Sequence, residues 1–192
     1  MIDFNFPILT SKFEKHKELK DTLLTLIEEQ QSGNLKQVDS YYTDSISKLD
    51  WDRKRDDTRP WTKIILKDLM DHFETQVKRL GLRDVRLYDL WFQQYSKEDT
   101  HGWHVHGENF TGVYYLELKE AAPKTQIIEP TTSRLITVDA QEGDVVIFPS
   151  MFIHRAPTVI WQTRKTIISF NFSCDNVDQQ YLQKIVDLYG LY

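Results

Sequence analysis

Apolar residues recur at helical spacing in the first third of the chain. Between residues 58 and 81 they form one stripe, which predicts a helix that ends at Gly81: Trp61, Ile64, Ile65, Leu69, Phe73, Val77 and Leu80. A second stripe, Phe13, Leu19, Leu23, Leu26 and Ile27, predicts a helix over residues 11–33, with Ser11 as its cap and Gly33 as its end. The polar connector Asn34 to Asp57 predicts a short helix or a hairpin.

After Gly81 the pattern changes to short β-type runs separated by turn residues. The runs are VRLYDLWFQQY, FTGVYYLEL, TQIIEP, RLITV, DVVIFP, FIHRAPTVI and KTIISFNF. Such a series predicts a sandwich or barrel, and the end of the chain predicts a short helix. We therefore expect one α+β domain: a mainly helical support region (1–81) packed on one sheet, a β core (82–175) and a C-terminal helix (176–192).

Charge and composition narrow the function classes. The formal net charge is −5, which argues against a surface built for nucleic-acid phosphates. No apolar run approaches the roughly 18 residues that cross a membrane, and the N-terminus lacks the basic-then-apolar layout of a secretory signal. The chain has one cysteine, Cys174, so no internal disulfide can form and we expect a cytoplasmic protein.

The stretch HGWHVHGEN carries the first candidate chemistry. On a β-strand side chains alternate, so His104 and His106 would point to one face while Val105 packs on the other. Two imidazoles about 6–7 Å apart along a strand can reach one ion, and imidazole suits Fe, Zn, Cu and Ni. An isolated His-x-His is more often a pair of surface histidines. His101 has no assigned role and is expected to be an exposed loop residue.

A second motif supports the metal hypothesis. In EGDVVIFPSMFIHRAP a turn leads into a strand, Pro149 ends it and His154 begins the next strand. Together with His104 and His106 this gives three ligands from two strands, which is the number a catalytic metal needs while it keeps positions open. The final strand, TRKTIISFNF, adds Arg164 and Lys165. Beside a metal site they suggest a cation inside the barrel that pairs with a carboxylate ligand.

The order of these motifs resembles the iron(II)/2-oxoglutarate-dependent oxygenases, in particular the prolyl-hydroxylase-like members. The resemblance spans roughly residues 85–173 and rests on WHVHGENFTGVYYLEL, IIEP, EGDVVIFPSMFIHRAP and RKTIISFNF. It implies a double-stranded β-helix (jelly-roll) core. It also implies Fe(II) as the metal, 2-oxoglutarate as co-substrate and O2 as oxidant, in a hydroxylase.

The resemblance further implies residue roles. His104 and His154 would be iron ligands. Tyr115 and a basic residue of the last strand would bind the distal carboxylate of 2-oxoglutarate, with Ser169 in the same pocket. Arg164 is favoured because its fork binds carboxylates bidentately, but counting by twos from Ser169 and Asn171 selects Lys165 unless a bulge intervenes. The candidates for the substrate pocket are Tyr95, Trp103 and Asn171, with Trp91 more often expected in core packing.

One position departs from the family pattern. The usual motif, His-x-Asp or His-x-Glu, completes a triad of two histidines and one carboxylate, whereas this chain has His106 there. Three arrangements are open, in this order: His106 ligates directly, Glu108 supplies the carboxylate instead, or only two residues ligate. An ordinary solvated loop charge is the simpler interpretation of Glu108.

Two other function classes compete. A cupin-type three-histidine metalloenzyme that does not use 2-oxoglutarate fits the histidines, although Met151 stands where that motif has Gly and Glu108 is one residue too close. A non-enzymatic metal-binding module is the other. For the oxygenase, the substrate is expected to be a protein side chain or peptide, an amino acid or a small metabolite. Nucleic acid is disfavoured, and neither the substrate nor the oligomeric state follows from the sequence.

Overall fold

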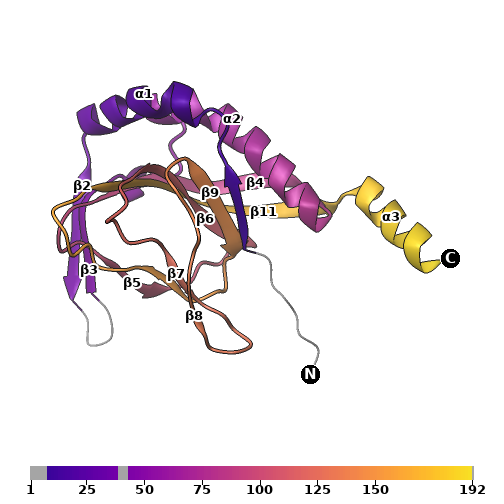
Figure 1. The fold of residues 1–192 in the computed structure, drawn as a ribbon. Helices are drawn as coiled ribbons and strands as arrows, with labels where there is room; N and C mark the ends of the chain where they lie inside the picture. Colours follow the sequence, from indigo (N-terminus) through magenta and orange to yellow (C-terminus); the bar gives the residue numbers. More distant parts are fainter. Residues whose placement is uncertain (1–7, 39–42, 192) are drawn as a thin grey trace.

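The chain folds around two antiparallel β-sheets (Figure 1). The computed structural model describes residues 8–38 and 43–191. The seven-stranded sheet has the order β1-β9-β6-β11-β4-β3-β2 and the four-stranded sheet the order β5-β10-β7-β8. The strands are β1 (Leu9–Lys12), β2 (Gly33–Val38), β3 (Thr43–Leu49), β4 (Leu82–Tyr95), β5 (His101–His104), β6 (Phe110–Leu118), β7 (Gln126–Ile128), β8 (Leu135–Thr137), β9 (Asp144–Pro149), β10 (His154–Ala156) and β11 (Lys165–Val177).

The larger sheet buries apolar residues on both faces, and β11 at its centre shows why. Its even-numbered residues, such as Ile168 and Phe170, belong to an apolar cluster under the helices. Its odd-numbered residues include Ile167, which belongs to the second cluster between the two sheets. Because alternate residues of a strand point to opposite faces, one strand serves both the support layer and the barrel interior.

Two helices cover the outer face of the larger sheet, α1 (His16–Glu29) and α2 (Pro60–Val77) (Figure 1). Their buried residues pack in the outer cluster, where the Phe73 ring lies 4.3 Å from the Phe170 ring. Pro60 occupies the first turn of α2, where its missing N–H costs nothing. The short 3-10 helix η2 (Lys78–Leu80) extends α2 to Gly81, whose φ of 75° closes the helix as the sequence predicts.

The N-terminal region differs from its sequence-based description. Ser11 does not cap a helix; it lies in β1 opposite Val145, and its hydroxyl contacts His72. Gly33 begins β2 rather than ending α1. The connector forms the β2–β3 hairpin and the 3-10 helix η1 (Trp51–Arg53). Three strands of the larger sheet therefore come from the part of the chain that was expected to be mainly helical.

The β core matches its prediction more closely. Each predicted run contains a strand, and β6 and β9 have the predicted bounds. The C-terminal helix α3 (Gln179–Tyr189) begins at Asp178, whose carboxylate accepts a hydrogen bond from the Tyr181 N–H, and projects from the body of the molecule (Figure 1). Among the described residues, no helix is long and apolar enough to span a membrane.

A buried ion pair ties the support layer to the barrel. Asp50, just before η1, accepts hydrogen bonds from Arg59, Trp61 and the Phe92 N–H, and Arg59 also donates to the Leu90 carbonyl. Both charged side chains are buried, and the extra hydrogen bonds compensate for their lost hydration. This buried ion pair and its hydrogen bonds hold the segment that carries Trp51 against β4.

Gly112 in β6 tests the packing of the larger sheet. A Cβ at this position would lie 2.0 Å from the Val146 carbonyl oxygen and 2.7 Å from the Phe170 ring, so Gly112→Ala forces the backbones of β6 and β9 apart. We expect a loss of about 1–3 kcal/mol in the free energy of unfolding, measured by urea denaturation. Gly33→Ala is the matched control, since a Cβ there meets nothing within 4 Å. Equal stability of the two variants would contradict this account.

Candidate metal centre

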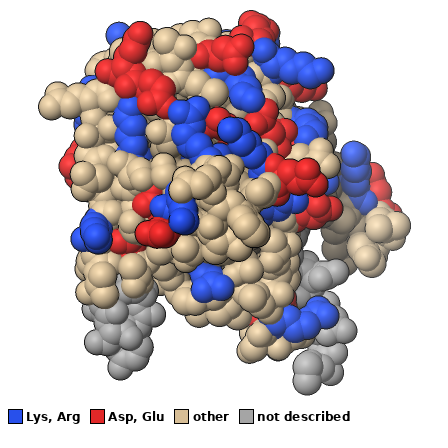
Figure 2. All heavy atoms as spheres, turned by 60° about the vertical axis from the view of Figure 1, so that its left-hand side comes forward, with Lys and Arg blue, Asp and Glu red and all other residues tan. Residues whose placement is uncertain are grey.

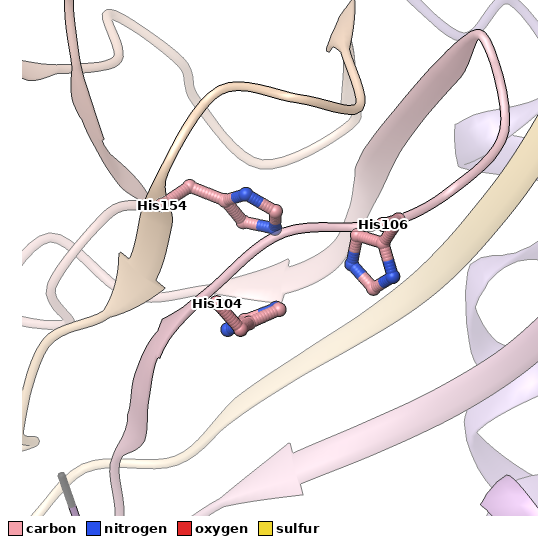
Figure 3. A group of neighbouring side chains, drawn as sticks. All are labelled: His104, His106 and His154. Atoms are coloured by element: carbon pink, nitrogen blue, oxygen red, sulfur yellow. The ribbon is translucent and has the colours of Figure 1, made fainter.

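Three histidines converge at the β5–β10 edge of the smaller sheet (Figure 3). His104 ends β5 and His154 begins β10, and the two residues are direct partners in the sheet. His106 follows on the loop, held by a hydrogen bond from its N–H to the Ser150 carbonyl. One ligand atom from each imidazole lies within 4.8 Å of the other two. The structure thus brings together all three predicted histidines.

The backbone arrangement that forms this cluster differs from the single regular strand that the sequence predicts. β5 ends at His104, so His104 and His106 do not share a face of one regular strand. Val105 does not pack inward; it is 53% exposed. The loop after β5 and the pairing of β5 with β10 create the cluster, with His106 brought in by its backbone contact to the β9–β10 turn.

Hydrogen bonds to main-chain carbonyls orient two of the imidazoles. His104 Nδ1 lies 2.7 Å from the Gly102 carbonyl oxygen, and His154 Nδ1 lies 2.8 Å from that of Phe152. A carbonyl only accepts, so each Nδ1 carries its proton and each Nε2 keeps a free lone pair. Oriented in this way, Nε2 is ready to bind a metal ion.

Burial keeps these imidazoles neutral. It lowers the pKa of His106 to about 4 and that of His154 well below its usual value, with the neighbouring histidines adding to both effects. The pKa of His104 is lowered for the same reason. Neutral imidazoles are the form that binds metal, so the donor set suits Fe(II) and related ions.

The structure also places two neighbours of the cluster, Glu108 and His101. Glu108 lies half-buried in the loop after His106 and is not part of the cluster that the described residues form. His101 is not an exposed loop residue: it lies in β5, stacked on His104 with ring centroids 3.9 Å apart. Burial lowers its pKa to about 3. The pairing of β5 with β10 shifts register next to it, which the sequence alone does not reveal.

A pocket enters the barrel beside the histidines, and a cleft adjoins it. His101, His104, His106 and Gln93 line both. The β2–β3 hairpin and η1 form the other wall of the cleft, with Leu35, Ile46, Leu49, Trp51 and Asp52. The histidine cluster therefore lies between the pocket inside the barrel and the cleft beside the hairpin.

Deeper in the barrel lies a buried lysine. Lys165 is 1% exposed, donates a hydrogen bond to the Pro123 carbonyl at 2.9 Å and lies 4.6 Å from the centre of the Tyr95 ring. Burial lowers its pKa to about 7. Among the described residues, no carboxylate forms an ion pair with it. Its hydrogen-bond partner is thus an uncharged carbonyl group.

Several polar groups surround the same interior. The Tyr115 hydroxyl donates to Thr125 at 2.8 Å, and burial raises its pKa to about 12. Ser169 donates to Gln93. The Tyr95 hydroxyl and the Trp91 Nε1 are buried without a partner among the described residues, and both side chains line the pocket. Trp91 thus belongs to the pocket wall as well as to the packed interior.

The predicted site residues Asn171, Arg164 and Trp103 line neither the pocket nor the cleft, and the Asn171 amide instead contacts His106 and Asp89. Arg164 points away from the pocket and binds Glu117 at 2.7 and 3.1 Å and Glu28 at 2.8 Å. The irregularity that could have turned it inward lies in β6, opposite Thr166 and Ile167, so β11 keeps its alternation and Lys165 faces inward. Trp103 lies under the Arg155 guanidinium, 4.5 Å away, and lines neither the pocket nor the cleft.

The architecture matches solved structures that share little sequence with this chain. No protein-family model and no curated protein matches the sequence. A 2OG-Fe(II) oxygenase family oxidoreductase from Burkholderia pseudomallei aligns over 82% of this chain and 79% of its own, with TM-score 0.66 and 16% identity. The fold is that of the 2-oxoglutarate- and iron(II)-dependent oxygenases.

Two further structures share this double-stranded β-helix. HygX from Streptomyces hygroscopicus, with nickel and 2-oxoglutarate bound, covers 87% of this chain and 82% of its own, with TM-score 0.63 and 10% identity. A prolyl hydroxylase from Trichoplax adhaerens, in complex with a hypoxia inducible factor peptide fragment, covers 88% and 84%, with TM-score 0.63 and 15% identity. At these identities the likeness establishes the fold.

The buried histidines give the metal-free protein a defined pH dependence. The unfolded chain protonates its histidines near pH 6.5, whereas folding lowers the pKa of His154 well below that value. The unfolded state therefore binds more protons below pH 6.5, so the free energy of unfolding decreases as the pH is lowered. In urea denaturation with a chelator between pH 6.5 and 5, His154→Gln should reduce this slope by up to about 1.4 kcal/mol per pH unit. An unchanged slope would show that His154 is protonated in the folded state.

Proposed function

We propose that this protein is a non-haem iron(II)- and 2-oxoglutarate-dependent oxygenase with three histidine ligands. The observation that carries the proposal is the pairing of two sites in one barrel. Three imidazole donor atoms lie within 4.8 Å of one another, and an inward-facing lysine without a carboxylate partner among the described residues lies deeper in the same interior. The first suits a divalent metal and the second a dicarboxylate.

The histidines would hold the ion. His104, His106 and His154 supply three donors, which leaves coordination positions for other ligands. Bound iron would supply O2 activation coupled to the oxidative decarboxylation of 2-oxoglutarate. The overall reaction then converts substrate C–H, O2 and 2-oxoglutarate into substrate C–OH, succinate and CO2. With His106 in place of a carboxylate, all three protein ligands are neutral, so the ion keeps its full charge toward anionic ligands.

Lys165 would bind the distal carboxylate of the co-substrate. Its ammonium supplies the charge, and Tyr115 and Thr125 lie on the neighbouring wall with hydroxyls that can hydrogen-bond an anion. Ser169 and the unpartnered Tyr95 hydroxyl add polar atoms to the same interior. Residues of both sheets line this pocket, so bound 2-oxoglutarate would displace water from it and strengthen these contacts.

The cleft above the histidines would take the substrate. Its described lining is mainly apolar on the hairpin side, and none of these lining residues is Lys or Arg. Figure 2 shows basic and acidic residues interspersed over the face that it presents, without a field of one sign. These features favour a peptide, an amino acid or a small metabolite over nucleic acid, which requires a basic surface. The open space suits a side chain presented on a larger molecule as well as a free small molecule.

Removing one imidazole tests the metal centre. We expect His154→Ala to lose bound Fe(II) and to lose 2-oxoglutarate-dependent succinate formation to below detection, because two neutral ligands hold the ion weakly. Metal content is measured by elemental analysis and succinate by chromatography, with and without O2. His16→Gln is the control, since His16 lies outside the barrel on α1. Undiminished succinate formation by the His154 variant would refute the oxygenase proposal.

The two adjacent basic residues give a matched test of co-substrate binding. Lys165→Met should weaken 2-oxoglutarate binding, measured by calorimetry with Mn(II), by about 10- to 100-fold, since it removes a buried charge-assisted contact. Arg164→Met should leave it within about 2-fold.

The pKa of Lys165, about 7, predicts a pH dependence of 2-oxoglutarate binding. Above that pH the free amine is neutral and binding must protonate it, so affinity falls as pH rises and protons are taken up from the buffer. Metal binding with no 2-oxoglutarate binding at all would instead indicate a cupin-type enzyme.

A further inference from the structure

His106 differs from the other two imidazoles in how it is held. His104 and His154 each donate Nδ1–H to a main-chain carbonyl two residues earlier. His106 lies off the strand, and its Nδ1 is 3.4 Å from Nδ2 of Asn171, a residue of β11. The third imidazole therefore depends on a side chain of another strand for its orientation.

Asn171 connects this imidazole to a carboxylate. It lies opposite Asp89 in the pairing of β11 with β4, and its Nδ2 is 3.3 Å from Asp89 Oδ2. Both residues are buried, at 2% and 3% exposure. Asp89 also contacts Lys54 at 3.3 Å and Arg55 at 3.1 Å. A buried carboxylate is thus fixed in place one residue away from the imidazole.

The amide of Asn171 is incompletely used. Its Nδ2 makes two long contacts, while its Oδ1 is buried without a partner among the described residues. An imidazole that offers Nε2 to a metal carries its proton on Nδ1, and that proton needs an acceptor. In the structure Nδ2 faces both His106 and Asp89, so supplying that acceptor requires the Asn171 side chain to shift on metal binding. The required arrangement has His106 Nδ1–H donating to Oδ1 while Nδ2–H donates to the Asp89 carboxylate.

We propose that Asn171 is a positioning residue that orients His106 for metal binding and links it to the carboxylate of Asp89. The inference rests on the proposed function, since it assigns a role at the same metal centre. The carboxylate of Asp89, itself paired with Lys54 and Arg55, then serves as the acceptor behind the amide. Polarised through the amide, His106 becomes a better donor than an isolated imidazole.

Metal affinity separates this role from a structural one. Mn(II) is titrated into the metal-free protein, and thermal unfolding of each variant is recorded without metal. Asn171→Leu should raise the Mn(II) dissociation constant by about 10- to 100-fold, the usual effect of losing a partner behind a metal ligand. The control is Asn176→Leu, which removes an Asn–Asp contact of the same kind (Asn176 to Asp84, 2.6 Å) farther along β11. It should leave the constant unchanged.

A charge swap provides the rescue. In the double variant Asn171→Asp with Asp89→Asn, the carboxylate accepts directly from His106 and the amide stands behind it, so the pair keeps its net charge. We expect a dissociation constant within about 3-fold of the wild type. The visible spectrum with saturating Co(II) should change for Asn171→Leu and revert in the swap, because it reports the ligand set rather than the fold.

The outcomes distinguish this inference from the proposed function. Wild-type affinity and an unchanged Co(II) spectrum in Asn171→Leu would overturn the positioning role while leaving the metal centre in place. A wild-type protein that binds neither Mn(II) nor Co(II) would overturn the proposed function and this inference together. Loss of affinity in Asn171→Leu with unchanged thermal unfolding, restored by the swap, supports it.

Discussion

Strict alternation along β11 is the constraint on which both layers of this protein depend. Its even positions fill the space under α1 and α2, and its odd positions face the barrel interior with Lys165, Ser169 and Asn171. A shift of one residue would put the lysine among the helices and the phenylalanines in the pocket. Because β4 and β6 pair with β11 along most of its length, this register is fixed on both sides.

The same constraint explains what the sequence could predict. Long segments with clear periodicity, β4, β6, β9, β11 and α2, were found because many residues repeat the same pattern. β1 was missed because four residues are too few to show alternation beside a helical stripe. β2 is almost entirely exposed, so no apolar pattern marks it. Such strands are specified by their partners, which a single sequence does not display.

The candidate site follows a similar division. Residue type and motif order identified His104, His106 and His154, and counting by twos placed Lys165 on the inner face. Chemical preference pointed to Arg164 instead, but two glutamates from other elements hold that guanidinium outside. His101 could not be placed, because its inward position depends on an irregular pairing of β5 with β10. Local periodicity can be recognised in a single sequence, whereas long-range partners and register shifts cannot.

The β2–β3 hairpin can vary in sequence independently of the candidate metal centre. It forms one wall of the cleft, yet β2 lies at the edge of the sheet, pairs with β3 and contributes little to the described cores. The Asp50–Arg59 ion pair anchors the end of β3 without any contribution from β2. A substitution in β2 can therefore alter the wall of the cleft while the histidines and the buried lysine stay in place.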